Sequence, residues 1–274
     1  MSYLPALQLD LEPFSTSPDP AFFYRSAGHY AALNRLEIAI RLRRGLSLVF
    51  GDVGTGKTTL LRTLLQNFGQ DEDDFELHMI LNPSYKSEYQ FLNHLTKIFG
   101  ISPFFRSAVD HRDAIEKYLF QRRVEENKTV VLLIDEGQKL TDPCLETLRT
   151  ILNYETNEQK MLQLVIFAQM ELLPRVKKIK NLMDRASLKC MISPLDEYEM
   201  GKMIEFRLKQ AGYSEERSLF TNEAINRIHA YSQGYPRKTA MICHQAMEKL
   251  VMFDLETVTA ELIARILADE KIWL

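Results

Sequence analysis

The 274-residue chain lacks several features that would assign it to a specialised class of protein. It has only three cysteines and no CxxC pair, so neither a disulfide framework nor a cysteine-based metal site is expected. No apolar run approaches the roughly 20 residues of a membrane-spanning helix, and the N-terminus lacks the pattern of a secretory signal. Repeats of fixed period are missing, which excludes solenoids and propellers. These absences favour a cytoplasmic protein without a membrane span of its own.

What the sequence does contain is the composition of an ordinary globular protein. Hydrophobic residues make up 46% of the chain and charged residues 26%. This length accommodates one large domain or two modest ones. The formal net charge of -3 means that any nucleic acid would have to be bound through a local basic patch.

Five short apolar runs alternate with segments of helical length over the first two thirds of the chain. They predict strands at residues 46–50, 75–81, 130–134, 162–167 and 188–192. Strands that alternate with helices predict an α/β fold, with a parallel sheet covered on both faces. Beyond Pro194 the pattern changes, and helices are expected near residues 197–211, 221–232, 236–252 and 256–269. We therefore expect an α/β domain over residues 1–193 and a small all-helical domain over residues 194–274.

The segment GDVGTGKT follows the first predicted strand and fits the pattern G-x-x-x-x-G-K-[ST]. Backbone N–H groups of such a glycine-rich loop, together with the positive end of the next helix, can surround a polyphosphate. Lys57 is expected to reach the β and γ phosphates, and Thr58 to offer its hydroxyl to Mg²⁺. The predicted nucleotide-binding residues of this loop are Gly51, Val53, Gly54, Thr55, Gly56, Lys57, Thr58 and Thr59.

A second motif, TVVLLIDE, is an apolar strand that ends in two carboxylates. Asp135 can bind the nucleotide's Mg²⁺ together with Thr58, and Glu136 can polarise the water that attacks the γ phosphate. Gln169 follows the next apolar strand and can bond that water or the γ phosphate; a simple strand cap is the alternative. The guanine-reading N-K-x-D motif and protein-kinase motifs are missing. ATP hydrolysis with Mg²⁺ is therefore the predicted chemistry.

These motifs resemble those of an AAA+ ATPase family that includes general secretion pathway protein A and short relatives in pilus biogenesis, and that is similar to ATPases regulating some transposons. LLIDEGQKL resembles the family's LLIDEAQNL, with Gly137 in place of Ala. VIFAQMEL resembles VGQPEL, with Ala168 and Met170 in place of Gly and Pro. The resemblance extends from Pro13 to about Leu250. It implies a P-loop NTPase sheet sandwiched by helices and followed by a helical lid.

The resemblance also implies roles for individual residues. Gln169 would sense the γ phosphate. LMDRASLKCMISPL resembles the segment that supplies an arginine to a neighbouring subunit, which nominates Arg185; a surface or ion-paired arginine is the alternative. SQGYPRKTAMIC resembles the G-x-P-R motif that opens a lid helix, which nominates Arg237 as a second sensor. The opening segment PFSTSPDPAFFYRSAGHYAAL would lie against adenine, so Phe14 or Tyr24 would pack on the base unless both are core aromatics.

Two functions are consistent with this resemblance. The leading one is an ATP-hydrolysing motor or switch that assembles as a homo-oligomeric ring or dimer. It would serve secretion or pilus machinery, in the cytoplasm or recruited to the inner membrane by its partners. Full-length secretion proteins of this type continue into a membrane span and a cell-wall-binding region, so this chain is expected to be a short form or a fragment.

The alternative function is an ATP-dependent DNA-binding regulator, as in the transposition relatives. The basic residues that would contact phosphates are Arg175, Lys177, Lys178, Lys180 and Arg185. A charged helix at a subunit interface would have the same composition. We favour the interface, because the net charge is acidic and no aromatic residues are interleaved with the lysines.

Overall fold

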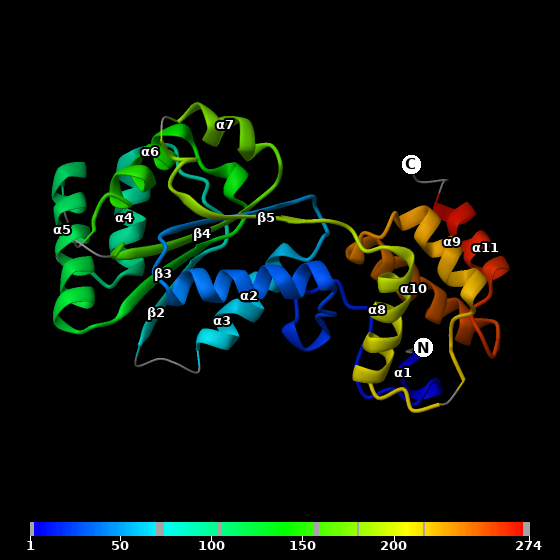
Figure 1. Cartoon of the computed structure of the whole chain (residues 1–274). Coiled ribbons are helices and arrows are strands. Elements are labelled where there is room, and N and C mark those ends of the chain that lie inside the picture. Colours follow the sequence, from blue (N-terminus) through cyan, green and yellow to red (C-terminus); the bar gives the residue numbers. More distant parts are fainter. Residues whose placement is uncertain are drawn as a thin grey trace. The chain divides into compact units, whose positions relative to one another are not determined.

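The computed structural model describes residues 3–69, 74–102, 106–155, 159–179, 181–215 and 217–270. The chain forms two compact units, whose elements are labelled in Figure 1. The sheet unit comprises residues 29–53 and 60–192, and the helical unit comprises residues 1–28, 54–59 and 193–274. The expected division into domains at residue 193 stays a prediction about folding units.

Five parallel strands form the centre of the sheet unit. They are β1 (Leu46–Gly51), β2 (Phe75–Ile80), β3 (Thr129–Ile134), β4 (Leu162–Ala168) and β5 (Ala186–Ile192). Their order is β2-β3-β4-β1-β5, and every pairing is parallel. Strands β1, β3 and β4 are buried along their whole length, which explains their uninterrupted apolar sequences. The predicted α/β fold is confirmed.

Helices cover both faces of this sheet (Figure 1). One face, which carries Leu48, Leu132 and Leu164, packs against four helices. These are α4 (Glu88–Ile98), α5 (Ala108–Phe120), α6 (Asp142–Ile151) and α7 (Leu172–Lys178). The opposite face is covered by the parts of α2 (Ala27–Arg41) and α3 (Lys57–Phe68) that belong to the sheet unit. Each parallel strand is thus joined to the next through a covering helix or helices.

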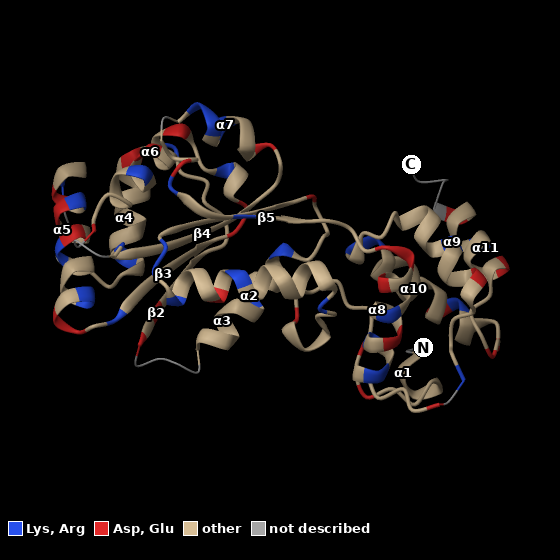
Figure 2. Cartoon of the chain, in the orientation of Figure 1, with Lys and Arg blue, Asp and Glu red and all other residues tan. Residues whose placement is uncertain are grey.

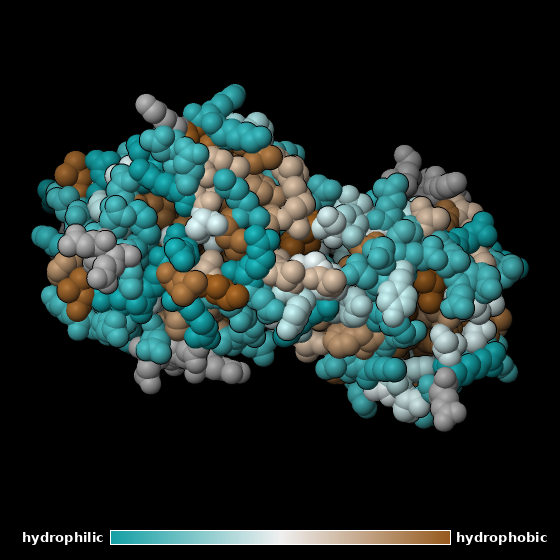
Figure 3. All heavy atoms as spheres, in the orientation of Figure 1, coloured by the Kyte–Doolittle hydropathy of each residue, from teal (hydrophilic) through white to brown (hydrophobic). Residues whose placement is uncertain are grey.

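Charged residues are spread over the helices of both units, with Lys and Arg evident on α7 (Figure 2). On the face drawn in Figure 3, hydrophobic residues gather over the C-terminal part of α2. There Ile38 and Leu42 are 56% and 57% exposed. A groove of about 330 Å³ beside them is also lined by Arg35, Arg44 and Leu188. This helix therefore has apolar residues on its outer side as well as on the side that packs against the sheet.

Four longer helices make up most of the helical unit. They are α8 (Glu197–Gln210), α9 (Asn222–Ser232), α10 (Pro236–Met252) and α11 (Ala260–Glu270), accompanied by α1 (Tyr3–Ala6) and the short η1 (Pro20–Phe22). Helices α8, α9 and α10 begin within one residue of their predicted starts. The prediction for α11 was wrong by four residues at its start. Val258 instead pairs with Phe220 as an extended bridge, and its N–H donates to the carbonyl of Leu219.

The N-terminal segment packs onto the helices of the same unit. Arg207 of α8 donates to the carbonyl oxygens of the two residues that flank Phe14, at 3.4 and 3.3 Å. Phe14 itself is 1% exposed and meets Phe220 edge to face, with ring centroids 6.0 Å apart. Tyr24 is partly buried beside α8. Of the two roles considered for Phe14, the structure shows the core aromatic.

The cysteines contribute to packing. All three, Cys144, Cys190 and Cys243, carry free buried thiols. Burial raises the pKa of the Cys243 thiol, which keeps it protonated and unreactive. Among the described residues, every helix is too short or too polar to cross a lipid bilayer.

The turn between α9 and α10 requires glycine at position 234. Gly234 has a φ of +74°, and its carbonyl accepts from the N–H of Leu195 at 2.9 Å. A Cβ atom built on Gly234 would lie 1.8 Å from the carbonyl oxygen of Leu195. The turn is thereby pressed against the residue that precedes α8, which leaves no space for a side chain.

We predict that Gly234→Ala lowers the free energy of unfolding by about 3 kcal/mol or more, because left-handed strain and steric overlap act together. Gly100→Ala is the matched control, since Gly100 has a φ of +67° but open space where its Cβ would lie. It should cost only the strain, about 1–2 kcal/mol. Urea denaturation followed by circular dichroism measures both losses. Equal losses would show that the contact with Leu195 has no effect.

Candidate functional site

The phosphate loop connects β1 to α3. Its residues Gly54 and Gly56 have φ angles of +83° and +97°, in the region that favours glycine. Helix α3 begins at Lys57, so the N–H groups of its first turn face the loop. Lys57 is only 7% exposed. A buried ammonium group at the positive end of a 12-residue helix suits a polyphosphate, so the residues present fit ATP.

Arg237 lies beside this loop within the helical unit. Its backbone N–H donates to the carbonyl oxygen of Gly54 at 3.3 Å. A Cβ atom on Gly54 would come within 3.1 Å of the Cβ of Arg237. Pro236 occupies the first turn of α10, as predicted, and the Arg237 side chain is exposed. The G-x-P-R motif and the phosphate loop, far apart in the sequence, are therefore in contact.

Strands β1, β3 and β4 are neighbours and point the same way, so their carboxyl ends meet at one edge of the sheet. Gly51 ends β1, Asp135 follows β3 and Gln169 follows β4. Asp135 is 3% exposed, and its Oδ1 accepts from the N–H of Glu136 at 2.9 Å. Within the described part of the chain, no cluster of three or more His, Cys, Asp or Glu could bind a metal alone. A single carboxylate suits Mg²⁺, which is usually bound through few protein ligands plus phosphates and water.

Glu136 adopts a backbone conformation that is rare for a residue with a side chain. Its φ is +53° and its ψ is +37°, in the left-handed region. Such strain is found most often at functional sites. The Glu136 Oε2 accepts from the Nε2 of Gln138 at 2.9 Å and lies 3.6 Å from the Nζ of Lys139. With about a third of its side chain exposed, the carboxylate is fixed in position yet open to water.

Gly137 allows the turn after β3 to lie directly on β4. A Cβ atom at this position would be 2.3 Å from the Cγ2 of Ile166 and 3.3 Å from the Cβ of Ala168. An alanine at position 137 would overlap the side chain of Ile166, so the close contact between this turn and β4 requires glycine.

Gln138 joins this turn to the end of β4. Its Oε1 accepts from the backbone N–H of Gln169 at 3.1 Å, while its Nε2 donates to Glu136. Sequence comparison places Gln138 in a family motif but gives it no role. The role depends on a contact between two loops, which leaves no periodic signal in the sequence.

Arg175 of α7 holds the same turn in place through hydrogen bonds to its backbone. Its guanidinium donates to the carbonyl oxygens of Gln138, at 2.9 Å, and Leu140. It also pairs with the Oδ1 of Asp142 through two N–H groups, at 3.0 and 2.7 Å. Arg175 is one of the five basic residues considered either for phosphate contacts or for a subunit interface, and in the structure its guanidinium donates to groups inside the chain. Lys180 of the same stretch lies outside the described residues.

Arg185 lies at the amino ends of the strands, opposite the edge that carries Asp135 and Gln169. It directly precedes β5, whose register places Ala186 beside the first residue of β1 and Ile192 beside the last. The seven residues of β5 separate Arg185 from the carboxyl edge by about 20 Å, too far for an arginine side chain. Its guanidinium donates to the carbonyl oxygen of Arg149 at 2.8 Å. Arg185 therefore does not join Asp135 and Gln169 of its own chain.

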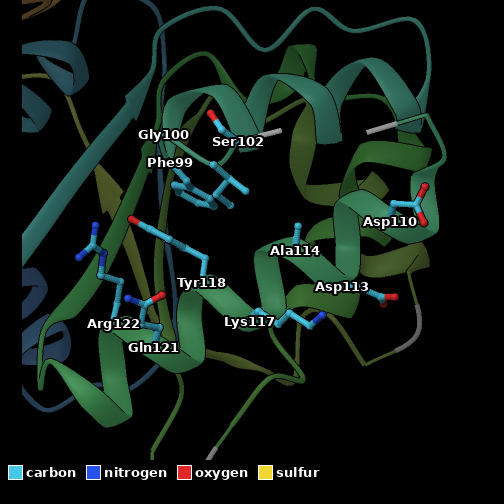
Figure 4. Close-up of a pocket in the computed structure, with 11 residues that line it drawn as sticks. Phe99, Gly100, Ser102, Asp110, Asp113, Ala114, Lys117, Tyr118, Gln121 and Arg122 are labelled. Carbon is cyan, nitrogen blue, oxygen red and sulfur yellow. The ribbon is translucent and has the colours of Figure 1, made fainter. Parts of the chain in front are cut away.

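A separate hollow of about 610 Å³ lies beside α5 (Figure 4). Phe99 and Tyr118 stack there with ring centroids 5.1 Å apart, and the Tyr118 hydroxyl is 3.2 Å from the Nε2 of His78. Burial lowers the pKa of His78 and raises that of Tyr118, so both are neutral at pH 7. In Figure 4 the carboxylates of Asp110 and Asp113 point away from the rings. The Tyr118 hydroxyl and His78 contact each other, and His78 also lies 3.4 Å from Glu76, so these groups are paired within the chain and the hollow gives no support for catalysis.

Comparison with known proteins shows which family this chain belongs to. A family model described as an AAA domain matches residues 40–176. The General secretion pathway protein A of Aeromonas hydrophila is 33% identical to this chain over 278 residues, which cover 95% of this chain and 48% of that protein. The chain thus spans about half the length of this curated relative.

Solved structures share the fold at lower sequence identity. The structure of Drosophila ORC bound to DNA has a TM-score of 0.73 and 21% identity, covering 98% of this chain and 66% of that one. The Aeropyrum pernix ORC2 protein, in ADPNP–ADP complexes, has a TM-score of 0.64 and 16% identity, covering 88% and 66%. At these identities the likeness shows the fold alone.

We predict that Arg175→Lys lowers the free energy of unfolding by about 1–3 kcal/mol, because an ammonium group cannot replace the planar fork that serves two carbonyls and a carboxylate. Lys178→Met, at an exposed position on the same helix, should change stability by no more than about 0.5 kcal/mol. Urea denaturation provides the comparison. A variant Arg175→Lys as stable as the wild type would mean that these bonds do not stabilise the turn.

Proposed function

This chain belongs to the AAA domain family of P-loop ATPases, and on that premise we propose that it binds ATP with Mg²⁺ and hydrolyses the γ phosphate as an oligomeric motor or switch. One observation carries the proposal. The strand that leads into the phosphate loop, the buried Asp135 and the end of β4 share one edge of a parallel sheet. This is the edge at which open α/β sheets bind their ligands.

The chain's own groups divide the work of nucleotide binding. The N–H groups of residues 51–59 and the ammonium of Lys57 would bind the β and γ phosphates. Thr58 and Asp135 would ligate Mg²⁺, which when bound neutralises charge on those phosphates. Arg237 would add a second cation from the first turn of α10, next to Gly54.

Hydrolysis would depend on the turn after β3. Glu136 would accept a proton from the attacking water, a role that suits a carboxylate held in place yet partly exposed. The Gln169 side chain would bond the γ phosphate or that water. Both groups approach from the same edge of the sheet, because β3 and β4 are adjacent.

We propose that Arg185 completes the site of a second copy of the chain. It precedes the edge strand β5 and is about 20 Å from the carboxyl edge of its own sheet. For Arg185 to neutralise developing charge on a γ phosphate, that phosphate would have to be bound by a neighbouring copy. This distance supports a homo-oligomer, ring or dimer, as the proposed active form.

The secretion relative supports a biological setting. Because General secretion pathway protein A of Aeromonas hydrophila matches nearly the whole of this chain, we propose that the ATPase serves secretion or pilus-type machinery. In that setting it would work in the cytoplasm, recruited to the inner membrane by its partners.

An ATP-dependent DNA-binding regulator is the second candidate. The Drosophila ORC structure with the same fold is bound to DNA, and Lys177 and Lys178 are exposed on α7. Against this candidate, the donors of Arg175 are used within the chain. ATP hydrolysis that is stimulated by duplex DNA and loses that stimulation with added salt would favour the regulator over the secretion motor.

We predict that Lys57→Ala abolishes tight ATP binding, whereas Glu136→Gln retains binding and stops hydrolysis. The lysine contacts phosphates in the ground state, and the glutamate acts only on the attacking water. Calorimetry with ATP and Mg²⁺, alongside phosphate release, separates the two effects. Equal loss of affinity in both variants would contradict these assignments.

We also predict that Arg185→Ala leaves ATP binding nearly intact but slows hydrolysis by about 10³-fold or more, the scale of arginine fingers. Mixing Arg185→Ala with Lys57→Ala should restore part of the activity, because some interfaces then pair an intact phosphate loop with an intact arginine. Phosphate release measured over a range of protein concentrations tests both points. No rescue on mixing, with activity strictly proportional to concentration, would overturn the shared site.

A further inference from the structure

The side chain of Gln138 forms hydrogen bonds with two residues, one that follows β3 and one that follows β4. Its Nε2 donates to the Oε2 of Glu136 after β3, at 2.9 Å, and its Oε1 accepts from the N–H of Gln169 after β4, at 3.1 Å. A backbone N–H can only donate and an ionised carboxylate can only accept, so one orientation of the amide satisfies both. The uncharged glutamine side chain is long enough to reach both Glu136 and Gln169, so it can form the two hydrogen bonds at once.

The backbone around Gln138 is fixed independently of its side chain. Arg175 donates to the carbonyl oxygens of Gln138 and Leu140, and Gly137 rests against Ile166 with no space for a Cβ. The Gln138 amide therefore has little freedom to move away from Glu136 and Gln169. If Gln169, which follows β4, changes position, the Gln138 side chain bonded to it would move as well and displace the carboxylate of Glu136.

We propose that Gln138 is a positioning residue, which sets the Glu136 carboxylate for its reaction with water according to the position of Gln169. The inference rests on the proposed ATPase function and adds to it. Gln169 would respond to the γ phosphate, and Gln138 transmits that response to the proton acceptor. The bonds of Gln138 go to Glu136 and Gln169 and it is not one of the residues proposed to bind ATP, so it should affect the rate of hydrolysis and not the binding of nucleotide.

Two substitutions of Gln138 separate donation from space filling. Gln138→Glu has the same shape and can still accept from the Gln169 N–H, but it cannot donate to Glu136 when ionised and brings two negative charges together. Gln138→Ala removes both bonds. Lys139 and Arg175 are the cations that face this turn, and both remain in each variant.

The experiment measures kcat for ATP hydrolysis and the Kd for ATP with the full chain. We expect both variants to lower kcat about 10- to 100-fold, with Gln138→Glu at least as slow as Gln138→Ala, and to change the Kd by less than about twofold. Gln121→Ala is the matched control, because Gln121 also donates its Nε2 to a glutamate, Glu126, at 3.1 Å on the exposed surface. This control should leave kcat and Kd unchanged.

The outcomes distinguish this inference from the function beneath it. A wild-type chain that shows no ATP hydrolysis at any concentration overturns both. If the wild type hydrolyses ATP and Gln138→Glu retains the wild-type kcat, the amide only fills space and the inference alone is overturned. A rise in Kd that accounts for the whole loss of activity also overturns it, since Gln138 would then act on binding.

Discussion

Parallel pairing of β1, β3 and β4 is the constraint on which the candidate site depends. Parallel strands need crossover connections, whose helices cover both faces of the sheet, and strands buried on both faces must be apolar. Polar side chains are then rare inside the strands, where Ser47 and Gln163 are buried near the first residues, and gather where the strands end. Because all the carboxyl ends lie at one edge, Asp135 and Gln169 are brought to the edge at which β1 leads into the phosphate loop. The burial of Asp135 is offset by the N–H of Glu136, which bonds its carboxylate.

The turn after β3 is held in a conformation that its own sequence disfavours. A left-handed conformation at Glu136 costs about 1–2 kcal/mol. Hydrogen bonds to charged groups contribute about 1.5–3 kcal/mol each, and Arg175 supplies several to this turn. The surrounding bonds therefore outweigh the strain. Gly137, where a Cβ would overlap Ile166, allows the close contact with β4 that makes these bonds possible.

Local patterns in the sequence predict the elements and the motifs, and long-range contacts account for what they miss. The apolar runs place all five strands, and Thr221 caps α9 through a bond to the N–H of Ala224, as its position near a helix start indicates. The start of α11 depends on pairing between Val258 and Phe220, which local sequence does not specify. Arg175 appears in the sequence as one member of a basic run. Its bonds to backbone carbonyls in another loop have no side-chain signature that a pattern could detect.

The two candidate arginines, Arg237 and Arg185, differ in what fixes their positions. Arg237 begins a helix of the same chain, and its backbone is bonded to Gly54, so its position depends on the packing of the helical unit, including the tight turn at Gly234. Arg185 is separated from the carboxyl edge of its own sheet by the full length of β5, and no rearrangement of side chains could bridge about 20 Å. If both act on one γ phosphate, the first reports on the state of its own chain and the second on the presence of a neighbour. Hydrolysis would then require a folded helical unit and an assembled oligomer together, which is the dependence that a switch needs.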